Sequence, residues 1–509
     1  MFKPQKKPKG FGENKKRIEL NNFNLKVKLE IANKKRINKE FIEAIENYKE
    51  IILVTPRLGE AHYNLGLCYK SLNLLDEAIE SFSKVLQLEP QNISVHLLLG
   101  NIYTKLKDFK SAKYYYQKGH KLDPNDFLLL NGLGNVLHKE NRYTEAINCF
   151  KTALKVVPNE AGILNNLGNS LVAISDFDEA IKNYCKAISK APLIQQFHLN
   201  LGFAYFYNGN YEEGWKEYEH RTKYKPINEL ESWEGQPLRP EQKLLIYSEE
   251  GLGDTIQFLR YAMHLKTKGI NFKLCIQDKL FSIVENTSLR INLIKYEQLN
   301  NEKFDFQVGL ISLPRILKIT KNKVIINDKY LSISKNISDK WKLNFKKQNC
   351  PVIGINWQGN PKAETNSGFG RSIALEQFSL LSTLPQIKFL SLQKTFGSEQ
   401  LENCSFKDVF VDFQEEFNPV LDFLEYASVI ENCDLVITTD TSTAHLAGSI
   451  GKKTWLILKK LPDWRWGVSG NATSWYKSIK IFRQTKPHSW SEVLEELKIS
   501  LINEFKLFP

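Results

Sequence analysis

The chain has 509 residues, too many for one hydrophobic core, and its 42% hydrophobic and 25% charged residues are typical of a globular protein. The formal net charge is +13, but the first fifty residues hold 14 Lys/Arg against 7 Asp/Glu, so the rest of the chain carries only +6. This distribution argues against a strongly basic face, and we expect no stable nucleic-acid binding. No run of 18 apolar residues and no secretory signal segment is present, so a cytoplasmic protein is expected.

Residues 1–21 begin MFKPQKKPKGFGENKKR, which is rich in Lys, Pro and Gly and poor in apolar groups. We predict a disordered basic tail, either a solvated arm or a weak contact with an anionic membrane surface or nucleic acid. The seven cysteines are scattered and never form C-x-x-C. They indicate reduced thiols without a zinc site, and we predict no metal ligands.

A period of 34 residues, the length of one TPR helix pair, dominates the N-terminal part of the chain. Three positions of the repeat recur: a glycine, an aromatic residue and a closing proline. The glycines are Gly66, Gly100, Gly134, Gly168 and Gly202, the aromatic residues are Phe82, Tyr116, Phe150, Tyr184 and Tyr218, and the prolines are Pro90, Pro124, Pro158, Pro192 and Pro226. Small residues allow two helices to approach closely, aromatic side chains fill the space between repeats, and proline ends a helix. Extrapolation backwards predicts six units over residues 22–226, the first of them a degenerate cap.

Asparagines recur at two positions of these repeats: Asn64, Asn166 and Asn200 at one, and Asn101, Asn135 and Asn169 at the other. An amide side chain both donates and accepts hydrogen bonds, which suits an extended peptide backbone. We therefore expect a groove that binds a protein or peptide partner. Exposed polar residues without a binding role are the alternative.

Short apolar runs alternate with helical segments after residue 226, a pattern that predicts parallel βαβ units. A linker over 227–242 precedes a first Rossmann-like half, 243–340, with strands at 243–248 and 271–276 and a helix from the intervening turn to about residue 268. The turn contains Gly251, Gly253 and Asp254 at the carboxyl end of the first strand. Open α/β sheets bind ligands at this place, although Asp254 is also a plausible plain N-cap.

The second Rossmann-like half spans 350–485. Strands are expected at 352–357, 388–393, 434–438 and 453–458, with helices at 375–383 and 419–431 and a polar loop over 358–372 that contains Arg371. The strand at 434–438 runs into Asp440, Thr441, Ser442 and, one helical turn later, His445. Hydroxyls and backbone N–H groups at a helix start suit a diphosphate, whereas an N-cap beside a buried histidine is the alternative. No P-loop or G-x-S-x-G motif is present, which disfavours an NTPase and a serine hydrolase.

Three segments carry a family resemblance: SEEGLGDTIQF at 248–258, DLVITTDTSTAHLAG at 434–448 and PDWRW at 462–466. They resemble bacterial TPR proteins with a C-terminal glycosyltransferase domain similar to the GT-B transferases of family nine, the heptosyltransferase group. The resemblance implies an acceptor-side half near 240–335, a donor-side half near 350–485, and a closing C-terminal helix within 489–509. The combination of TPR repeats and a GT-B domain is also similar to the architecture of protein O-GlcNAc transferases.

The same resemblance implies a metal-independent hexosyl- or heptosyl-type glycosyltransferase without a cofactor beyond its nucleotide-diphosphate sugar, acting on a glycan, lipid or protein acceptor. Asp254 matches the proposed catalytic base. The implied donor-binding residues are Gly251, Gly253, Gln257, Arg371, Asp440, Thr441, Ser442 and His445. Trp464 or Trp466 is a candidate to stack on a sugar or base, with core packing as the alternative. There are two competing functions: a non-catalytic TPR adaptor with a degenerate transferase domain, and a sugar-nucleotide epimerase.

Overall fold

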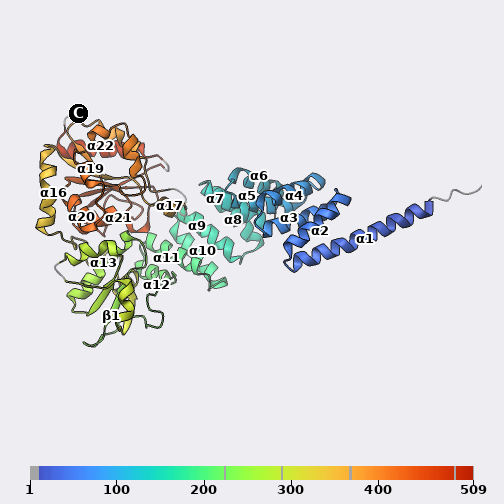
Figure 1. Ribbon diagram of the computed structural model, residues 1–509, viewed down its shortest axis with the longest axis horizontal. Helices are drawn as coiled ribbons and strands as arrows, with labels where there is room; N and C mark the ends of the chain where they lie inside the picture. The colour runs from blue at the N-terminus through green and yellow to red at the C-terminus, as the bar shows by residue number, and fades with distance from the viewer. Residues whose placement is uncertain (1–10, 223–224, 288–289, 366–369, 487–488, 508–509) are drawn as a thin grey trace, which may run out of the picture. The chain divides into compact units, whose positions relative to one another are not determined.

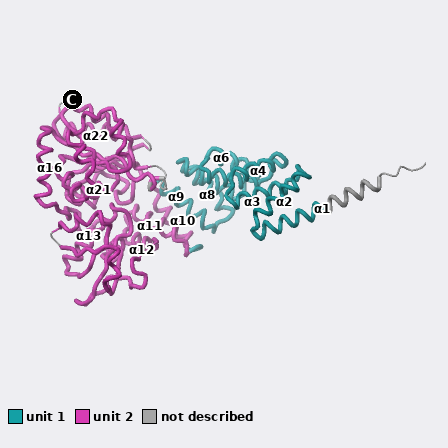
Figure 2. The backbone as a smooth tube through the Cα atoms, in the orientation of Figure 1, with its two compact units in different colours: residues 1–174, 189–191 teal, residues 175–188, 192–509 magenta. Residues whose placement is uncertain are grey.

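The computed structural model describes residues 11–222, 225–287, 290–365, 370–486 and 489–507. The chain divides into two compact units, shown in different colours in Figure 2. Unit 1 comprises residues 1–174 and 189–191, and unit 2 comprises residues 175–188 and 192–509.

The N-terminal part is an all-helical TPR array of twelve helices within the described residues (Figure 1). They are α1 (Phe11–Ile37), α2 (Phe41–Val54), α3 (Gly59–Ser71), α4 (Leu75–Leu88), α5 (Ile93–Lys105), α6 (Phe109–Leu122), α7 (Phe127–Lys139), α8 (Tyr143–Val156), α9 (Ala161–Ala173), α10 (Phe177–Lys190), α11 (Gln195–Tyr207) and α12 (Tyr211–Tyr218). From α3 onward, the first helix of each pair begins 34 residues after the previous one. The predicted repeat and its register are therefore confirmed.

Close packing between helices explains the recurring glycine and aromatic positions. A Cβ atom on Gly66 would lie 2.7 Å from the ring of Phe82, and one on Gly134 would lie 2.6 Å from the ring of Phe150. Both aromatic rings are fully buried. These repeats thus require a residue without a side chain opposite the aromatic ring.

The predicted disordered tail is wrong for residues 11–21, because α1 begins at Phe11. The last proline of the tail is Pro8, and residues 11–37 contain no other, so nothing interrupts the backbone hydrogen bonds of this helix. Lys, Glu and Leu are good helix formers and are frequent in it. Residues 1–10 lie outside the described residues.

The first α/β half of unit 2 is a parallel sheet with the strand order β3-β2-β1-β4. The strands are β1 (Leu244–Tyr247), β2 (Phe272–Cys275), β3 (Asn292–Leu293) and β4 (Phe306–Gly309), with α13 (Leu252–Thr267), α14 (Phe281–Glu285) and α15 (Leu313–Ile316) around them. The predicted linker is part of this fold, since Ser232 bridges to Gln307 of β4 and Trp233 is buried.

The second half is a five-stranded parallel sheet with the order β6-β5-β7-β8-β9. Its strands are β5 (Val352–Asn356), β6 (Lys388–Ser391), β7 (Leu435–Thr439), β8 (Thr454–Leu458) and β9 (Ile479–Arg483); the helices are α16 (Lys335–Lys347), α17 (Pro361–Thr365), α18 (Ser379–Ser382), α19 (Gln414–Phe417), α20 (Phe423–Asn432), α21 (Ser442–Ser449) and α22 (Ser491–Phe505). The predicted helix at 375–383 is instead a 3₁₀ turn, Leu375–Phe378, followed by α18. α22 packs on the core of this half through Val493, Leu497 and Leu501.

Each sheet has one point where the strand order reverses, between β1 and β4 in the first and between β5 and β7 in the second. Ligands of open parallel sheets bind outside the carboxyl ends of the strands at such a point. Helix α13 starts after β1, α21 starts after β7, and the two helices pack against each other. The two reversal points therefore face one another within unit 2.

The last TPR repeat is fused to the α/β part of unit 2 by aromatic packing. Phe206 stacks on Trp464 with ring centroids 4.2 Å apart, and Trp215 meets the same ring edge-on. The hydroxyl of Tyr207 donates a hydrogen bond to the carbonyl of Pro462 at 2.6 Å. Repeat six is therefore continuous with the core that holds the sheets.

Candidate active site

A cavity of about 510 Å³ lies where α13 and α21 begin. Its walls come from both α/β halves and include Gly251, Gly253, Asp254, Asn356, Arg371, Lys394, Asp440, Thr441, Ser442, His445, Asp463 and Arg465. The two predicted loops are in contact, because a Cβ atom on Gly253 would lie 3.0 Å from His445 Cδ2 and 3.5 Å from Ser442 Cα. Residues from two loops far apart in the sequence thus share one cavity.

Asp254 stands in the first turn of α13, with 30% of its side chain exposed toward the cavity. Arg465 Nη2 donates a hydrogen bond to Asp254 Oδ1 at 2.5 Å, and Arg465 Nη1 donates to Asp463 Oδ1 at 2.9 Å. Burial disfavours the charged guanidinium, but these two carboxylates more than offset it and raise the pKa of Arg465. The carboxylate of Asp254 is therefore held in one orientation by a permanent positive charge.

Gln257 does not line the cavity, contrary to its predicted role in donor binding. Its side chain is fully buried, and its Oε1 accepts a hydrogen bond from Arg465 Nε at 2.7 Å. Gln257 lies about one turn after Asp254 on the same face of α13, and both side chains bind Arg465, but Gln257 is fully buried whereas Asp254 is partly exposed. Gln257 positions Arg465.

The two candidate stacking tryptophans are both buried, each with 2% exposure, and neither lines the cavity. Trp464 packs against the last TPR repeat, as described above. Trp466 lies beside His445, with ring centroids 5.2 Å apart. Core packing, the alternative weighed for these residues, is what the structure shows.

The start of α21 is held by hydrogen bonds to the end of β5. Thr441 Oγ1 donates to Asn356 Oδ1 at 2.8 Å, so the hydroxyl of Thr441 is already engaged. Asn356 Nδ2 in turn donates to Gln393 Oε1 at 2.9 Å. Ser442 lines the cavity, and the first backbone N–H groups of a helix have no partner within it. This end of α21 can accept an anion.

His445 lies one turn into α21 and is buried. Burial, and then the positive charge of Arg465, hold the pKa of His445 well below its usual value, so the ring is neutral. Its Nδ1 is 3.0 Å from the hydroxyl of Tyr476, whose own pKa is raised by burial. The tautomer of His445 decides which of the two groups donates in this bond.

Two further charged groups line the cavity beside this turn. Burial and the nearby carboxylate of Asp463 raise the pKa of Asp440. Burial lowers the pKa of Lys394 to about 8, and its Nζ donates to the carbonyl of Phe417 at 2.6 Å. Arg371 also reaches the cavity, 3.8 Å from Glu364. The walls thus present both cations and carboxylates to a ligand.

Sequence reasoning missed several wall residues. Asn356 ends β5 and Lys394 follows β6, so their place after buried strands could have marked them. Arg465 lies in the PDWRW segment, where only the two tryptophans were considered as site residues. No feature of the neighbouring sequence identifies this arginine as the partner of Asp254. Such a pairing across 211 positions follows only from the packing of unit 2.

The asparagines of the predicted groove differ in their surroundings. Asn64 is buried, with 6% exposure, and donates to Asn33 Oδ1 at 3.0 Å, so it joins two repeats and does not face a groove. Asn101 is exposed and accepts from the hydroxyl of Tyr116 at 2.8 Å. The remaining four are partly exposed: Asn135, Asn166, Asn169 and Asn200.

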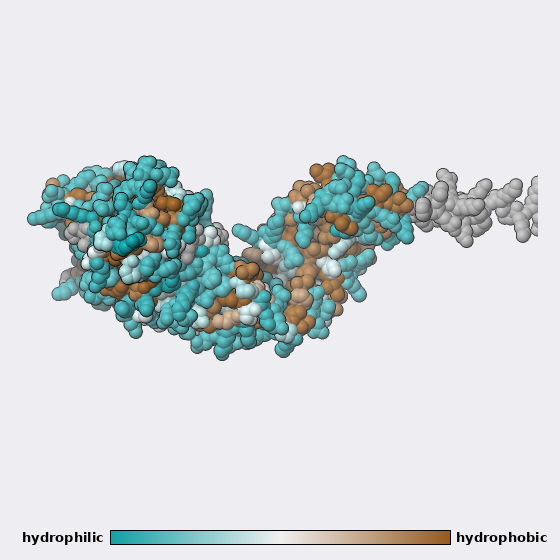
Figure 3. All heavy atoms as spheres, turned by 90° about the horizontal axis from the view of Figure 1, so that it is seen from below, coloured by the Kyte–Doolittle hydropathy of each residue, from teal (hydrophilic) through white to brown (hydrophobic). Residues whose placement is uncertain are grey.

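Apolar side chains also reach the surface of the array, where brown patches appear among the polar residues in Figure 3. The most exposed in the first repeats are Ile37, Ile42, Leu53 and Val54. Among the described residues, no helix is both long and apolar enough to cross a membrane.

Family models of the tetratricopeptide repeat match residues 59–92, 93–126 and 165–219, and a TPR repeat model matches residues 134–174. TPR repeats over residues 59–219 are therefore shown both by these matches and by the helices, and they support a protein-interaction role. No curated protein matches the chain.

Solved structures of TPR proteins resemble part of the chain. A MamA protein is 24% identical, with 33% of this chain and 92% of MamA covered and a TM-score of 0.32. YrrB, described as a TPR protein with an unusual peptide-binding site, is 21% identical, with 34% and 89% covered and a TM-score of 0.31. A tetratricopeptide repeat protein from Parabacteroides merdae is 19% identical, with 38% and 77% covered and a TM-score of 0.36.

Proposed function

We propose that unit 2 is a GT-B glycosyltransferase that uses a nucleotide-diphosphate sugar, and that the TPR array binds the acceptor or a protein that presents it. The observation that supports this most is the shared cavity, because the carboxylate of Asp254 and the start of α21 both line it. A base and an anion site in one cavity are what sugar transfer from a diphosphate requires.

The cavity has the size and charge for such a donor. Its volume of about 510 Å³ is within the usual range for small-molecule sites. The first turn of α21, Arg371 and Lys394 are assigned to the diphosphate, since they present positive charge or N–H donors to the cavity. Ser442 adds a hydroxyl donor there, and His445 adds an imidazole ring.

In the proposed reaction an acceptor hydroxyl attacks the anomeric carbon of the sugar. The new bond joins this carbon to the acceptor oxygen, and the bond from the carbon to the diphosphate oxygen breaks. Asp254 takes the proton of the acceptor hydroxyl, while Arg465 keeps its carboxylate oriented. The leaving diphosphate carries the electron pair and is stabilised by the groups around α21.

Nucleotide sugars with uridine, guanosine or adenosine, tested in a thermal-shift panel, identify the donor, since a ligand that binds the folded state raises its melting temperature. Release of nucleoside diphosphate then measures transfer to acceptor or to water. Asp254→Asn should reduce transfer by about 10²- to 10⁴-fold and retain donor binding. Asp328→Asn is the matched control, because Asp328 is an exposed aspartate that does not line the cavity.

A non-catalytic adaptor would bind a partner through its repeats and would not be stabilised by any nucleotide sugar. Full activity of the Asp254→Asn variant would equally contradict the proposed chemistry. The two results differ, because the first rejects the donor site and the second rejects only the base.

A further inference from the structure

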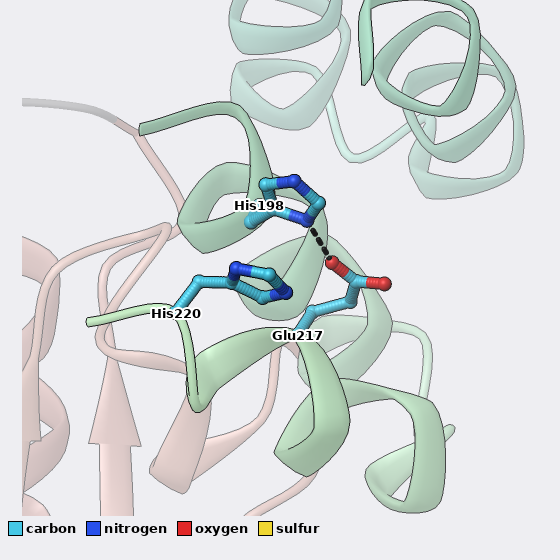
Figure 4. Close-up of side chains that lie close together, drawn as sticks. All are labelled: His198, Glu217 and His220. Atoms are coloured by element: carbon cyan, nitrogen blue, oxygen red, sulfur yellow. Dashed lines mark hydrogen bonds and ion pairs between the residues drawn. The ribbon is translucent and has the colours of Figure 1, made fainter. Parts of the chain in front are cut away.

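Three potential metal ligands lie together in the last TPR repeat, apart from the cavity (Figure 4). His198 is in the first turn of α11, Glu217 is in the last turn of α12, and His220 follows that helix. One ligand atom from each lies within 4.8 Å of the other two. His198 Nδ1 and Glu217 Oε2 are 2.7 Å apart.

A bond that recurs in the array determines which nitrogen of His198 carries hydrogen. His198 Nε2 is 2.9 Å from the carbonyl of Pro192, and His62 and His96 make the same contact with the prolines six residues before them. A proline carbonyl can only accept, so Nε2 donates in each case. In the neutral ring, Nδ1 of His198 therefore holds a lone pair.

Glu217 makes the environment of this Nδ1 different from that of His96 Nδ1, which is buried and has no hydrogen-bond partner. A carboxylate oxygen and a nitrogen lone pair at 2.7 Å repel each other unless a positive species lies between them. A proton does this in an imidazolium–carboxylate pair, and a metal ion can replace it. The His198 side chain is only 10% exposed and Glu217 is 23% exposed, so the unpaired arrangement would be costly.

His220 supplies a third ligand from the solvent side. Its ring is exposed and stacks on that of His198 with centroids 3.7 Å apart and an angle of 14°. Neutral imidazoles are good ligands for transition metals. Gln195 Nε2 donates to the carbonyl of His220 at 2.5 Å and so holds its backbone beside α11.

We propose that His198 Nδ1, Glu217 Oε2 and a ring nitrogen of His220 bind one divalent transition-metal ion of the Zn²⁺ class. Two imidazoles and one carboxylate are a known ligand set for Zn²⁺, and water fills the remaining position on the exposed side. Bonds of about 2.0–2.2 Å need the nitrogen and oxygen atoms to separate slightly, which rotation of the Glu217 side chain allows. Because an imidazole nitrogen binds a metal in the plane of its ring, the exposed His220 ring must also turn out of its stack on His198.

Such an ion would connect the start of α11 with the end of α12 and the residue just before Arg221. Arg221 Nη2 donates to both oxygens of Glu249, at 2.9 and 2.8 Å, at the carboxyl end of β1. The ion would therefore strengthen the junction between the last repeat and the first sheet. It has no role in the proposed transfer reaction.

Isothermal titration of the tag-free, chelator-treated full chain with Zn²⁺ tests the site. We expect one equivalent to bind with proton release, and a melting temperature that rises with Zn²⁺. Co²⁺ should show an absorption spectrum without thiolate charge transfer, because no cysteine belongs to the ligand set.

The variants Glu217→Gln and His220→Ala should each weaken binding by at least about tenfold. His220 is exposed, so its replacement leaves the packing of the repeat intact. His96→Gln is the matched control, because His96 has the proline contact without a carboxylate at Nδ1, and it should bind Zn²⁺ as the wild type does. Equal binding by wild type and both variants, a thiolate signal, or no uptake at about 100 times the protein concentration would overturn the proposal.

Discussion

Arg221 forms a buried ion pair that joins the end of the last repeat to the turn that carries Asp254. Only 4% of the Arg221 side chain and 3% of the Glu249 side chain are exposed. Arg221 Nη2 also donates to Ser312 Oγ at 2.8 Å. Burial opposes the charge on Arg221, but Glu249 and Glu219 more than offset it, so its pKa is raised.

Replacement of this arginine by methionine should destabilise unit 2 by about 3–5 kcal/mol, the usual cost of leaving one charge of a buried pair without its partner. The carboxylate of Glu249 cannot turn away easily. It fills the space that Gly309 leaves open, where a Cβ atom would lie 1.9 Å from Glu249 Oε2. Glu249 immediately precedes the turn to Asp254, so weaker donor binding should accompany the loss of stability.

Urea unfolding followed by tryptophan fluorescence measures this effect in unit 2 alone, because all nine tryptophans lie beyond residue 214. The double variant Arg221→Met/Glu249→Met should recover much of the lost stability, since apolar side chains of similar volume can replace a buried pair. A loss below about 1 kcal/mol for Arg221→Met, or strictly additive effects in the double variant, would refute this reasoning.

Three further predictions concern the cavity and the aromatic junction. Gly253→Ala should weaken donor affinity about tenfold in titrations, because its Cβ atom crowds His445. Gly251→Ala should leave the affinity unchanged, because its Cβ atom makes only an ordinary contact at 3.4 Å. Equal affinities of the two variants would contradict this. Burial and a neighbouring carboxylate raise the pKa of Asp440, so ionising this carboxyl group costs more in the folded than in the unfolded state. The cost is present at high pH, where the group is ionised, and absent below about pH 4, where it is protonated in both states. Asp440→Asn should therefore raise the melting temperature at pH 8 but not at pH 4, and a pH-independent change would count against it. Trp464→Ala should cost about 3–5 kcal/mol in urea unfolding, and a cost near zero would show that this ring is not part of the core.

The helical array was predictable because its contacts repeat locally. Phe82, Tyr116 and Phe150 each pack on a glycine of their own repeat, so one period of the sequence contains both partners. The α/β strands were predicted where they are central in a sheet, since buried parallel strands appear as apolar runs. The strands that were not predicted, β3, β4 and β9, are all at sheet edges, where shorter or more polar segments suffice, although the edge strand β6 was predicted.

The candidate site was predictable only in part. Gly253 and Asp254 could be recognised because a glycine turn after a strand is a local feature, and the same holds for the hydroxyl groups near Thr441. The burial of Gln257 and Trp464 was not, because it depends on which elements cover them.

By itself, the sequence determined the number and register of the repeats, the central strands, and the two loops with ligand-binding character, since these depend on neighbouring residues and on short-range periodicity. Tertiary structure alone decided that the two loops share one cavity, that Arg465 pairs with Asp254, and that His198 meets Glu217. The physical reason is that the partner of a charged side chain is a residue far away in the sequence. A short motif is compatible with many such partners, and only the packing of the surrounding core decides which of them lies next to it.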